Sequence, residues 1–376
     1  MVMRLILLTI FGPLFEFNIP LILIALLCSL IFMPIASILV HGIDTLLTYF
    51  FMFLKSMPAC YIYFSHQQAL IILQVFTFFL IAWLITWHGR KYMTYRFIVC
   101  SFLIMITSYY VQEKEDEQTW YVDVIDVGQG LSVLVRTQDQ SLLYDTGARY
   151  ASGFSMAQSE ILPYLRYIGI ASLEYLVISH SDNDHAGGAS LIEKAMHPRR
   201  IKLGEPLRKQ VLANSSFCDV GERWALGKLS VTVLSPFKRL KNSNNNSCVL
   251  RISDGQHAVL LSGDINKKQE ALIVSQFSSQ LASQILIAPH HGSKYSSSKL
   301  WISVVKPKWV VFSVSAMNRW GFPVQEVVER YKKQSVIRVS SGTSGFIRFK
   351  IDSHGIKLQT IREDLAAYWY HRSFFL

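Results

Sequence analysis

The most informative segment of the sequence is Ser179-His180-Ser181-Asp182-Asn183-Asp184-His185-Ala186-Gly187-Gly188. It places two histidines and two aspartates, all residue types that ligate metals, within six positions. The apolar run Leu173–Ser179 leads into it and is typical of a buried strand. Burying these four side chains without partners is costly, whereas a divalent cation neutralises and coordinates them. We therefore expect a metal-binding loop at a strand end; the alternative is a polar turn with capping aspartates.

Two later segments also end a predicted strand with metal-ligand residue types. Leu260–Ser262 leads into Gly263-Asp264, and Ile285–Pro289 leads into His290-His291-Gly292-Ser293. A Gly-Asp pair alone is a common turn, and a histidine pair alone is usually of no special significance. Together with the first stretch, however, these segments predict one shared metal site at an edge where strands end.

From Thr119 onward, short β-rich runs alternate with helical stretches. Hairpins in both halves with helices between them predict an α+β fold in which two β-sheets pack face to face with helices outside. The predicted strands are Trp120–Val127, Leu131–Arg136, Ser141–Tyr144, Leu173–Ser179, Leu229–Leu234, Cys248–Ile252, Ala258–Ser262, Gln284–Ala288 and Trp309–Val314. The predicted helices are Ser159–Tyr167, Lys267–Gln276, Ser297–Val304 and Val324–Lys332.

The motif series resembles the metallo-β-lactamase superfamily, whose fold is an αββα sandwich. More closely, residues 119–350 resemble the extracytoplasmic nuclease domain of ComEC-type DNA-internalisation competence proteins. The resemblance implies a metal-dependent nuclease that acts during DNA uptake for natural transformation and degrades the non-transported strand beside the channel. The blocks that carry it are Asp126-Val127-Gly128-Gln129-Gly130, Asp145-Thr146-Gly147, His180-x-Asp182-x-Asp184-His185, Asn246-Ser247, Gly263-Asp264, Pro289-His290-His291-Gly292-Ser293 and Asn318-Arg319-Trp320-Gly321-Phe322-Pro323.

The chain departs from the family pattern at several positions. Asp182 stands where the superfamily has its second histidine, as is usual in ComEC-type proteins, and a later histidine is missing near Asn245 or Asn246. Phe322 stands where many relatives carry a histidine. The chain is also short and resembles a C-terminal part that keeps the last channel helices. We therefore expect a separate chain to supply the other helices, with other competence proteins as further partners.

The resemblance implies a centre that holds two divalent ions. We expect Asp184, His185 and Asp264 to bind one ion, and His180 with Asp182 to bind the second. Oxygen donors favour manganese or magnesium over zinc, so manganese is the expected metal. The side chains expected to act directly in catalysis are Asp184, His185, Asp264 and His291.

Other residues are expected to complete or support this centre. Either His290 or His291 is a ligand or lies over the scissile phosphate, and the sequence leaves both possibilities open. Asp145, Asn246 and Ser293 are expected to hold the ligands in place. For Asp145, an ordinary turn at a strand end is an equally compatible interpretation.

The expected substrate is DNA, in single-stranded form, and the basic character of the chain agrees with it. The formal net charge is +11, and positive charge attracts polyanions. Each basic residue taken alone is also compatible with an ordinary solvated surface. The residues predicted to follow the DNA backbone are Arg199, Arg200, Lys238, Arg239, Lys306 and Lys308.

The first 111 residues predict an all-α transmembrane segment of about three helices. They contain only seven charged side chains, and the chain as a whole is 51% hydrophobic. A helix needs about 20 apolar residues to cross a bilayer. The predicted spans are Ile19–Val40, Ala69–Trp87 and Phe97–Val111, and Asp44–Phe64 is expected to be interfacial or re-entrant.

The loops between these spans predict an orientation in the inner (plasma) membrane. Basic residues at 88–91 and at Arg96 follow the second span, whereas the acidic run 113–117 follows the third. Positive charge favours the cytoplasmic side. We therefore expect a multi-pass segment over residues 1–111 and an acidic linker over 112–118. The hydrolase domain over 119–363 would face the extracytoplasmic side and precede a tail over 364–376.

The sequence leaves open whether two cysteines pair, and it is compatible with two alternative functions. Cys218 and Cys248 are the cysteines of the polar part, and they would pair only in an oxidising compartment. A second functional hypothesis is a DNA-channel subunit or a remnant whose hydrolase fold is an inactive docking platform. A third is a membrane-anchored hydrolase of a small ester or lactam, against which the change to Asp182 argues.

Overall fold

The computed structural model describes residues 118–208 and 211–365, together with positions 37, 40–42, 44, 45, 48, 49 and 77. The predicted membrane spans lie outside these residues except at Ser37, Val40 and Thr77. Most of the predicted linker and tail also lies outside them. Within the described positions, no helix combines the length and apolar character that crossing a bilayer requires.

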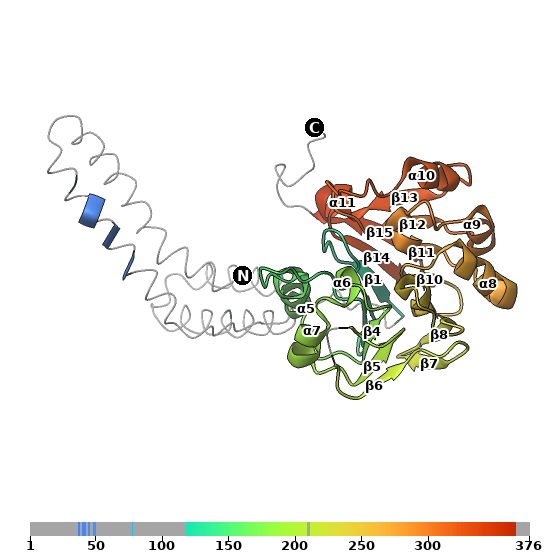
Figure 1. Cartoon of the computed structure of the whole chain (residues 1–376), viewed down its shortest axis with the longest axis horizontal. Helices are drawn as coiled ribbons and strands as arrows, with labels where there is room; N and C mark the ends of the chain where they lie inside the picture. Colours follow the sequence, from blue (N-terminus) through green and yellow to red (C-terminus); the bar gives the residue numbers. More distant parts are fainter. Residues whose placement is uncertain are drawn as a thin grey trace, which may run out of the picture. The chain divides into compact units, whose positions relative to one another are not determined.

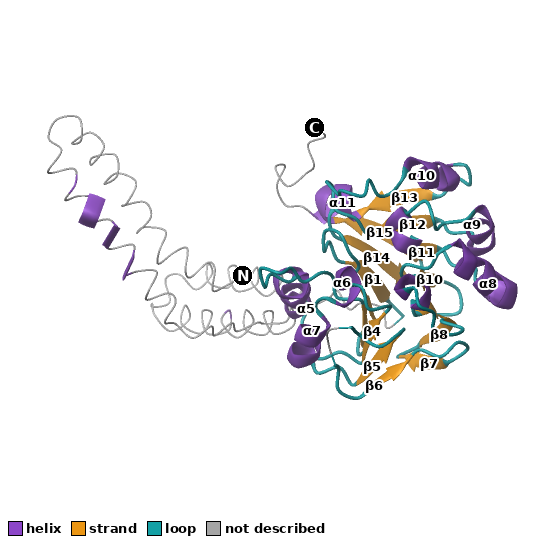
Figure 2. Ribbon diagram, viewed as in Figure 1, coloured by secondary structure: helices purple, strands orange, loops and turns teal. Residues whose placement is uncertain are grey.

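Two β-sheets face each other, and helices cover their outer faces (Figures 1 and 2). The first sheet has the strand order β15-β14-β1-β2-β3-β4-β5-β6, and the second has the order β13-β12-β11-β10-β9-β8-β7. The first contains β1 (Trp120–Val124), β2 (Val133–Arg136), β3 (Ser141–Tyr144), β4 (Tyr175–Ile178), β5 (Arg200–Leu203), β6 (Ser215–Phe217), β14 (Ile347–Asp352) and β15 (Gly355–Thr360). The second contains β7 (Arg223–Leu226), β8 (Leu229–Ser235), β9 (Val249–Ser253), β10 (Ala258–Leu261), β11 (Ile285–Ile287), β12 (Trp309–Phe312) and β13 (Ile337–Ser340). This confirms the predicted α+β sandwich.

Short helices complete the outer layers and the turns between strands. The helices on the side of the first sheet are α5 (Leu162–Tyr167), α6 (Asn183–Ala186) and α7 (Ala189–Met196). Those on the side of the second are α8 (Lys267–Phe277), α9 (Lys299–Val305) and α10 (Gln325–Lys332), while α11 (Ser341–Ser344) follows β13. Helical turns lie at Ala157–Ile161, Ser243–Asn246, Ser278–Gln280, Pro289–Gly292 and Ile361–Leu365.

The alternation of side chains along each strand explains the layers. In β4, Tyr175 and Val177 join the core between the two sheets, whereas Leu176 and Ile178 join the core beneath α5 and α7. Because β4 is buried on both faces, its sequence is an unbroken apolar run. A separate cluster beneath α8, α9 and α10 covers the outer face of the second sheet.

The parallel strands gather the motif residues at one edge of the sandwich. Strands β3, β4 and β5 are parallel in the first sheet, and β10 to β13 are parallel in the second. Asp145 follows β3 and His180 follows β4, while Asp264 follows β10 and the histidine pair follows β11. Carboxyl ends of parallel strands meet at the same edge, so residues distant in sequence come together there.

Several strands were not predicted, and one predicted strand is too long. The missed strands are short or hold charged residues, as in β5 and in the hairpin of β14 and β15. The prediction of Trp120–Val127 as one strand is wrong, because β1 ends at Val124. The chain leaves the sheet there, and its backbone at Gly130 approaches the carbonyl oxygen of Asp184 so closely that a Cβ would overlap that oxygen. A side chain does not fit at this position, so glycine is required.

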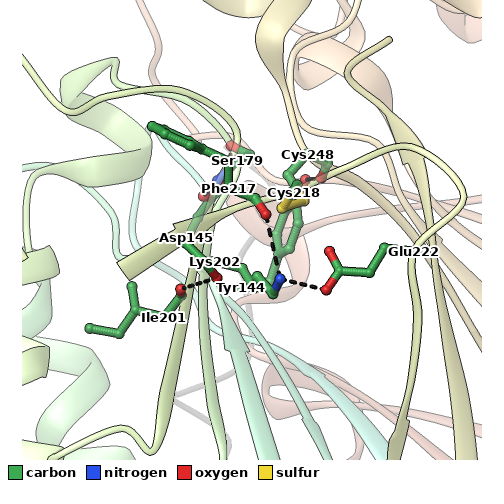
Figure 3. Close-up of a disulfide and its surroundings, with 10 residues drawn as sticks. Tyr144, Asp145, Ser179, Ile201, Lys202, Phe217, Cys218, Glu222 and Cys248 are labelled. Carbon is green, nitrogen blue, oxygen red and sulfur yellow. Dashed lines mark hydrogen bonds and ion pairs between the residues drawn. A yellow bond between two sulfur atoms is a disulfide. The ribbon is translucent and has the colours of Figure 1, made fainter. Parts of the chain in front are cut away.

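A disulfide joins Cys218 and Cys248 and links the end of β6 in one sheet to the start of β9 in the other (Figure 3). Both cysteines are buried. The backbone N–H of Cys248 donates to the carbonyl of Ser179 at 2.9 Å, and the Tyr144 hydroxyl donates to the carbonyl of Cys248 at 2.7 Å. The disulfide therefore lies directly beside the strand end that carries the first motif. It answers the question of pairing that the sequence left open.

Candidate metal centre

Four side-chain atoms converge at the edge where the motif strands end. They are Asp184 Oδ2, His185 Nε2, Asp264 Oδ1 and His291 Nε2, and the measured separations between them lie between 3.2 and 3.8 Å. In a tetrahedral site with metal–ligand distances of about 2.0–2.2 Å, the ligand atoms lie about 3.3–3.6 Å apart. The cluster therefore has the dimensions of a metal-binding site and combines two imidazole nitrogens with two carboxylate oxygens.

A second group of ligand types adjoins the first and shares Asp264 with it. His180 Nε2 lies 3.6 Å from Asp182 Oδ2, and ligand atoms of His180, His185 and Asp264 all lie within 4.8 Å of one another. The other carboxylate oxygen of Asp264, Oδ2, lies 3.7 Å from His290 Nε2. Asp264 thus adjoins both groups, with Oδ1 facing His185 and His291 and Oδ2 facing His290.

The hydrogen bonding of these side chains is compatible with a bound cation. His180 Nε2 and Asp264 Oδ1 are buried and have no hydrogen-bond partner among the residues that the structure describes. Leaving buried polar atoms unpaired is costly, so each is expected to have a partner of another kind. A divalent cation with nitrogen and oxygen ligands satisfies both atoms, and the residues therefore fit the group that the motif implies.

The charges in the cluster also favour a cation. Burial alone would raise the pKa of Asp264, but the neighbouring charges of His185 and His291 outweigh it and hold that pKa well below its usual value. Burial would likewise lower the pKa of His185, yet the carboxylates of Asp264 and Asp145 raise it. The carboxylates therefore remain ionised and attract positive charge, which a metal ion supplies better than protons do.

Hydrogen bonds on the far side of each imidazole turn the ligand nitrogens toward the cluster. His185 donates from Nδ1 to Asp145 Oδ2 at 2.7 Å, and His291 donates from Nδ1 to the carbonyl of Ser313 at 2.8 Å. Asp145 also accepts from the backbone N–H and the hydroxyl of Ser179, both at 2.7 Å. These bonds select the tautomer that leaves Nε2 free to bind a metal. Asp145 therefore orients a candidate ligand, which goes beyond the role of an ordinary turn residue.

The backbone separates the roles of the two adjacent histidines. His290 and His291 both have positive φ, 50° and 56°, a conformation that few residues other than glycine adopt. As a result, His291 is buried in the cluster, whereas the side chain of His290 remains 25% exposed beside Asp264. The ring of His290 also lies 6.0 Å from that of Phe322. The sequence could not decide between the two histidines, and the geometry favours His291 as the ligand of the tetrahedral cluster.

A buried carboxylate that the sequence analysis missed supports the loop of the first motif. Glu205 accepts hydrogen bonds from the backbone N–H of Ser181 at 3.0 Å, from the hydroxyl of Ser243 and from the side-chain amide of Asn246 at 2.6 Å. The Asn246 side chain also accepts from the backbone N–H of Leu240 at 2.6 Å and donates to the Leu240 carbonyl at 2.8 Å. Glu205 follows β5 by two positions, and because β5 itself was not predicted, the sequence contained no signal for this role.

Two further residues lie near the histidine pair. Asn244, rather than Asn245 or Asn246, approaches the centre: its Nδ2 lies 3.4 Å from His290 Nε2. Ser293 is buried, and its backbone N–H donates to the carbonyl of His290 at 2.8 Å. Its hydroxyl accepts from the backbone N–H of Tyr295 at 3.4 Å. Ser293 therefore supports the turn that carries the histidines.

The six basic residues predicted to bind DNA are divided between two edges. Arg199 and Arg200 lie at the start of β5, and Lys306 and Lys308 precede β12, so these four lie at the edge opposite the cluster. Arg199 is also paired with Glu174 at 3.3 Å. Lys238 and Arg239 follow β8, whose carboxyl end lies at the same edge as that of β10, because both strands are antiparallel to β9. Their neighbour Leu240 bonds Asn246. Lys238 and Arg239 therefore lie nearer to the cluster than the other four basic residues do.

Comparison with known proteins identifies relatives that match the segment carrying the first motif. Residues 125–207 match the Metallo-beta-lactamase superfamily, and this segment contains the first motif. Recombination protein 2 of Haemophilus influenzae is 37% identical over 277 residues, which are 73% of this chain and 34% of that protein. Competence protein ComA of Neisseria gonorrhoeae is 34% identical over 266 residues, 70% of this chain and 37% of that protein.

A third relative extends the comparison to a Gram-positive organism. ComE operon protein 3 of Bacillus subtilis is 28% identical over 278 residues, 67% of this chain and 35% of that protein. The chain spans about a third of the length of these curated relatives. The chain therefore belongs to the ComEC family of competence proteins and carries a metallo-beta-lactamase domain.

Proposed function

We propose that this chain is a metal-dependent phosphodiesterase that cleaves DNA during uptake for natural transformation and degrades the strand that is not transported. The observation that carries the proposal is the convergence of Asp184, His185, Asp264 and His291 at separations of 3.2 to 3.8 Å. The names of two relatives, Recombination protein 2 and Competence protein ComA, support a role in competence, and DNA is the substrate that this role implies.

In this proposal Asp184, His185, Asp264 and His291 hold one divalent ion, and His180, Asp182 and Asp264 hold a second. Manganese is the favoured metal, because carboxylates supply much of the donor set. When bound, the ions polarise a phosphoryl oxygen and lower the pKa of a bound water.

The chain's own side chains orient the substrate through hydrogen bonds. Asp184, whose side chain is 34% exposed, lies at the open side of the cluster and accepts a hydrogen bond from a reacting group there. Burial lowers the pKa of His290, so its partly exposed imidazole is neutral near pH 7 and donates a hydrogen bond to a phosphate oxygen. Asp145 keeps His185 in a fixed orientation throughout.

We further propose that residues 1–111 form the membrane segment, 112–118 a linker, 119–363 the hydrolase domain and 364–376 a tail, with that domain on the extracytoplasmic side of the plasma membrane. The Cys218–Cys248 disulfide supports this side, because disulfides persist in oxidising compartments and are rare in the cytosol. Single-stranded DNA and other competence proteins are the proposed partners.

The test is cleavage of labelled single-stranded DNA by the purified full chain with manganese. We expect Asp184→Asn to lower the cleavage rate by at least about 100-fold, because one carboxylate of the four-atom cluster is neutralised. Asp139→Asn is the matched control: Asp139 is exposed on the turn between β2 and β3, at the opposite edge, and should leave the rate unchanged.

Two outcomes would contradict the proposal. Cleavage that survives Asp184→Asn would remove this centre from the reaction. A wild-type chain that binds DNA but never cleaves it, whichever divalent metal is added, would instead favour the docking-platform hypothesis.

A further inference from the structure

Exposed aromatic side chains cluster on the loops at the edge that carries the metal centre. Tyr150 and Phe154 are 47% and 51% exposed, Tyr295 is 62% exposed and Trp320 is 49% exposed. The rings of these four side chains are therefore accessible to a ligand. These four residues follow β3, β11 and β12, the strands whose carboxyl ends define this edge.

The first pair lies on the side of the first sheet. Tyr150 and Phe154 face each other with ring centroids 5.9 Å apart, in a small hairpin closed by a backbone hydrogen bond between the same two residues. The adjacent backbone N–H of Arg149 donates to the side chain of Asn183, within the first motif, at 3.4 Å. The hairpin is therefore attached directly to the metal-binding loop.

The other two aromatic residues lie on the side of the second sheet, and each is accompanied by a cation. The ammonium of Lys294 lies 5.2 Å from the ring centre of Tyr295, and the guanidinium of Arg319 lies 4.3 Å from that of Trp320. Tyr295 belongs to the loop that begins at His291, and its N–H bonds Ser293. The loop of Trp320 is attached through Phe322, whose ring lies edge-on to that of His290.

We infer that these aromatic residues form stacking platforms on both sides of the centre, and that they bind unpaired bases of a single-stranded nucleic acid. The inference rests on the proposed function and names side chains that would bind its substrate. Every base offers a π-face to an aromatic ring, and each stack contributes about 1–3 kcal/mol. The cations beside Tyr295 and Trp320 neutralise neighbouring phosphates. In a duplex the faces of the bases are covered by their neighbours, so such platforms select strands that are unpaired.

A lipid headgroup region is the other class of partner that aromatic and basic side chains suit. The location favours the nucleic acid. Both groups of platforms are attached to the loops that carry candidate ligands, through Asn183 on one side and Phe322 on the other. A strand held by both would cross the four-atom cluster, whereas a lipid surface in contact with both would cover it.

The test measures binding alone, with the full chain in excess EDTA, so that neither metal nor cleavage contributes. Fluorescence anisotropy would compare a labelled oligothymidylate, an abasic strand of equal length and a blunt duplex. We expect the oligothymidylate to bind most tightly. We expect Phe154→Ala and Trp320→Ala each to weaken its binding by about tenfold, with Trp320→Phe retaining it. Tyr167→Ala is the matched control, because Tyr167 is 76% exposed at the end of α5, which leads to the opposite edge.

Specific results would overturn the inference. Equal affinity for the abasic strand would show that only the phosphates are bound. Unchanged DNA binding by Phe154→Ala and Trp320→Ala, with weaker binding to anionic phospholipid vesicles, would assign the surface to lipid. Failure of the proposed function is distinguishable, because a chain without nuclease activity would still show the stacking preference in EDTA.

Discussion

Asp264→Ala should remove both metal ions and lower manganese-dependent cleavage of DNA by on the order of a thousandfold, equivalent to about 4 kcal/mol. Asp264 is buried between the two groups of ligand types, with Oδ1 facing His185 and His291 and Oδ2 facing His290. No other carboxylate among the described residues touches both sides in this way. The loss of Asp264 also removes the carboxylate charge that attracts the imidazoles of His185, His290 and His291. The measurement is metal content by mass spectrometry together with the cleavage rate.

His180→Ala provides the matched comparison, because His180 belongs to one side of the centre only. We expect this variant to lose one ion and keep the other, whereas Asp139→Ala, on the opposite edge, should keep both. Retention of two ions by Asp264→Ala would show that this aspartate is not shared between them. A centre in which Asp264 bridges two ions would then be wrong.

Removal of the disulfide, in a Cys218→Ser and Cys248→Ser double variant, should lower the free energy of unfolding by about 3–4 kcal/mol. The bond closes a loop with a sequence separation of 30 residues and joins the two sheets. Without it, the unfolded chain gains conformational entropy. The start of β9, which bonds Ser179 beside the centre, also loses its covalent support. Urea unfolding of the full chain, followed by near-UV circular dichroism of this domain, measures the change.

Treatment of the wild-type chain with a reductant should reproduce the loss of stability seen in the double variant. The free energy of unfolding of the double variant should not change when the reductant is added. The double variant is therefore the control for effects of the reductant on other cysteines. Identical unfolding midpoints for the wild-type chain with and without reductant would show that the disulfide is absent or contributes nothing.

The layers of the fold and most residues of the candidate centre could be predicted because they depend on local sequence. An apolar run followed by His180, Asp182, Asp184 and His185 indicates a buried strand and a metal loop without knowledge of the rest of the chain. The Gly263-Asp264 turn was identified in the same way. Helices α8 and α10 begin and end within about two residues of their predicted bounds, since their apolar spacing is regular.

Other features depend on contacts between distant segments and could not be predicted. The choice between His290 and His291 is decided by two consecutive positive φ angles and by the carbonyl of Ser313, which no local pattern reveals. The role of Glu205 depends on loops that follow β4 and β8. The basic residues at β5 and β12 were chosen by charge alone, and charge does not indicate the edge of a sheet on which a residue lies.

The most direct test of the metal centre is anomalous diffraction at the manganese absorption edge from crystals of the full chain grown with manganese. The structure predicts a peak about 2.0–2.3 Å from Asp184 Oδ2, His185 Nε2, Asp264 Oδ1 and His291 Nε2, with a second peak beside His180 and Asp182. A map in which manganese binds elsewhere, and these four atoms contact no ion, would contradict the assignment of this edge as a metal-dependent active site.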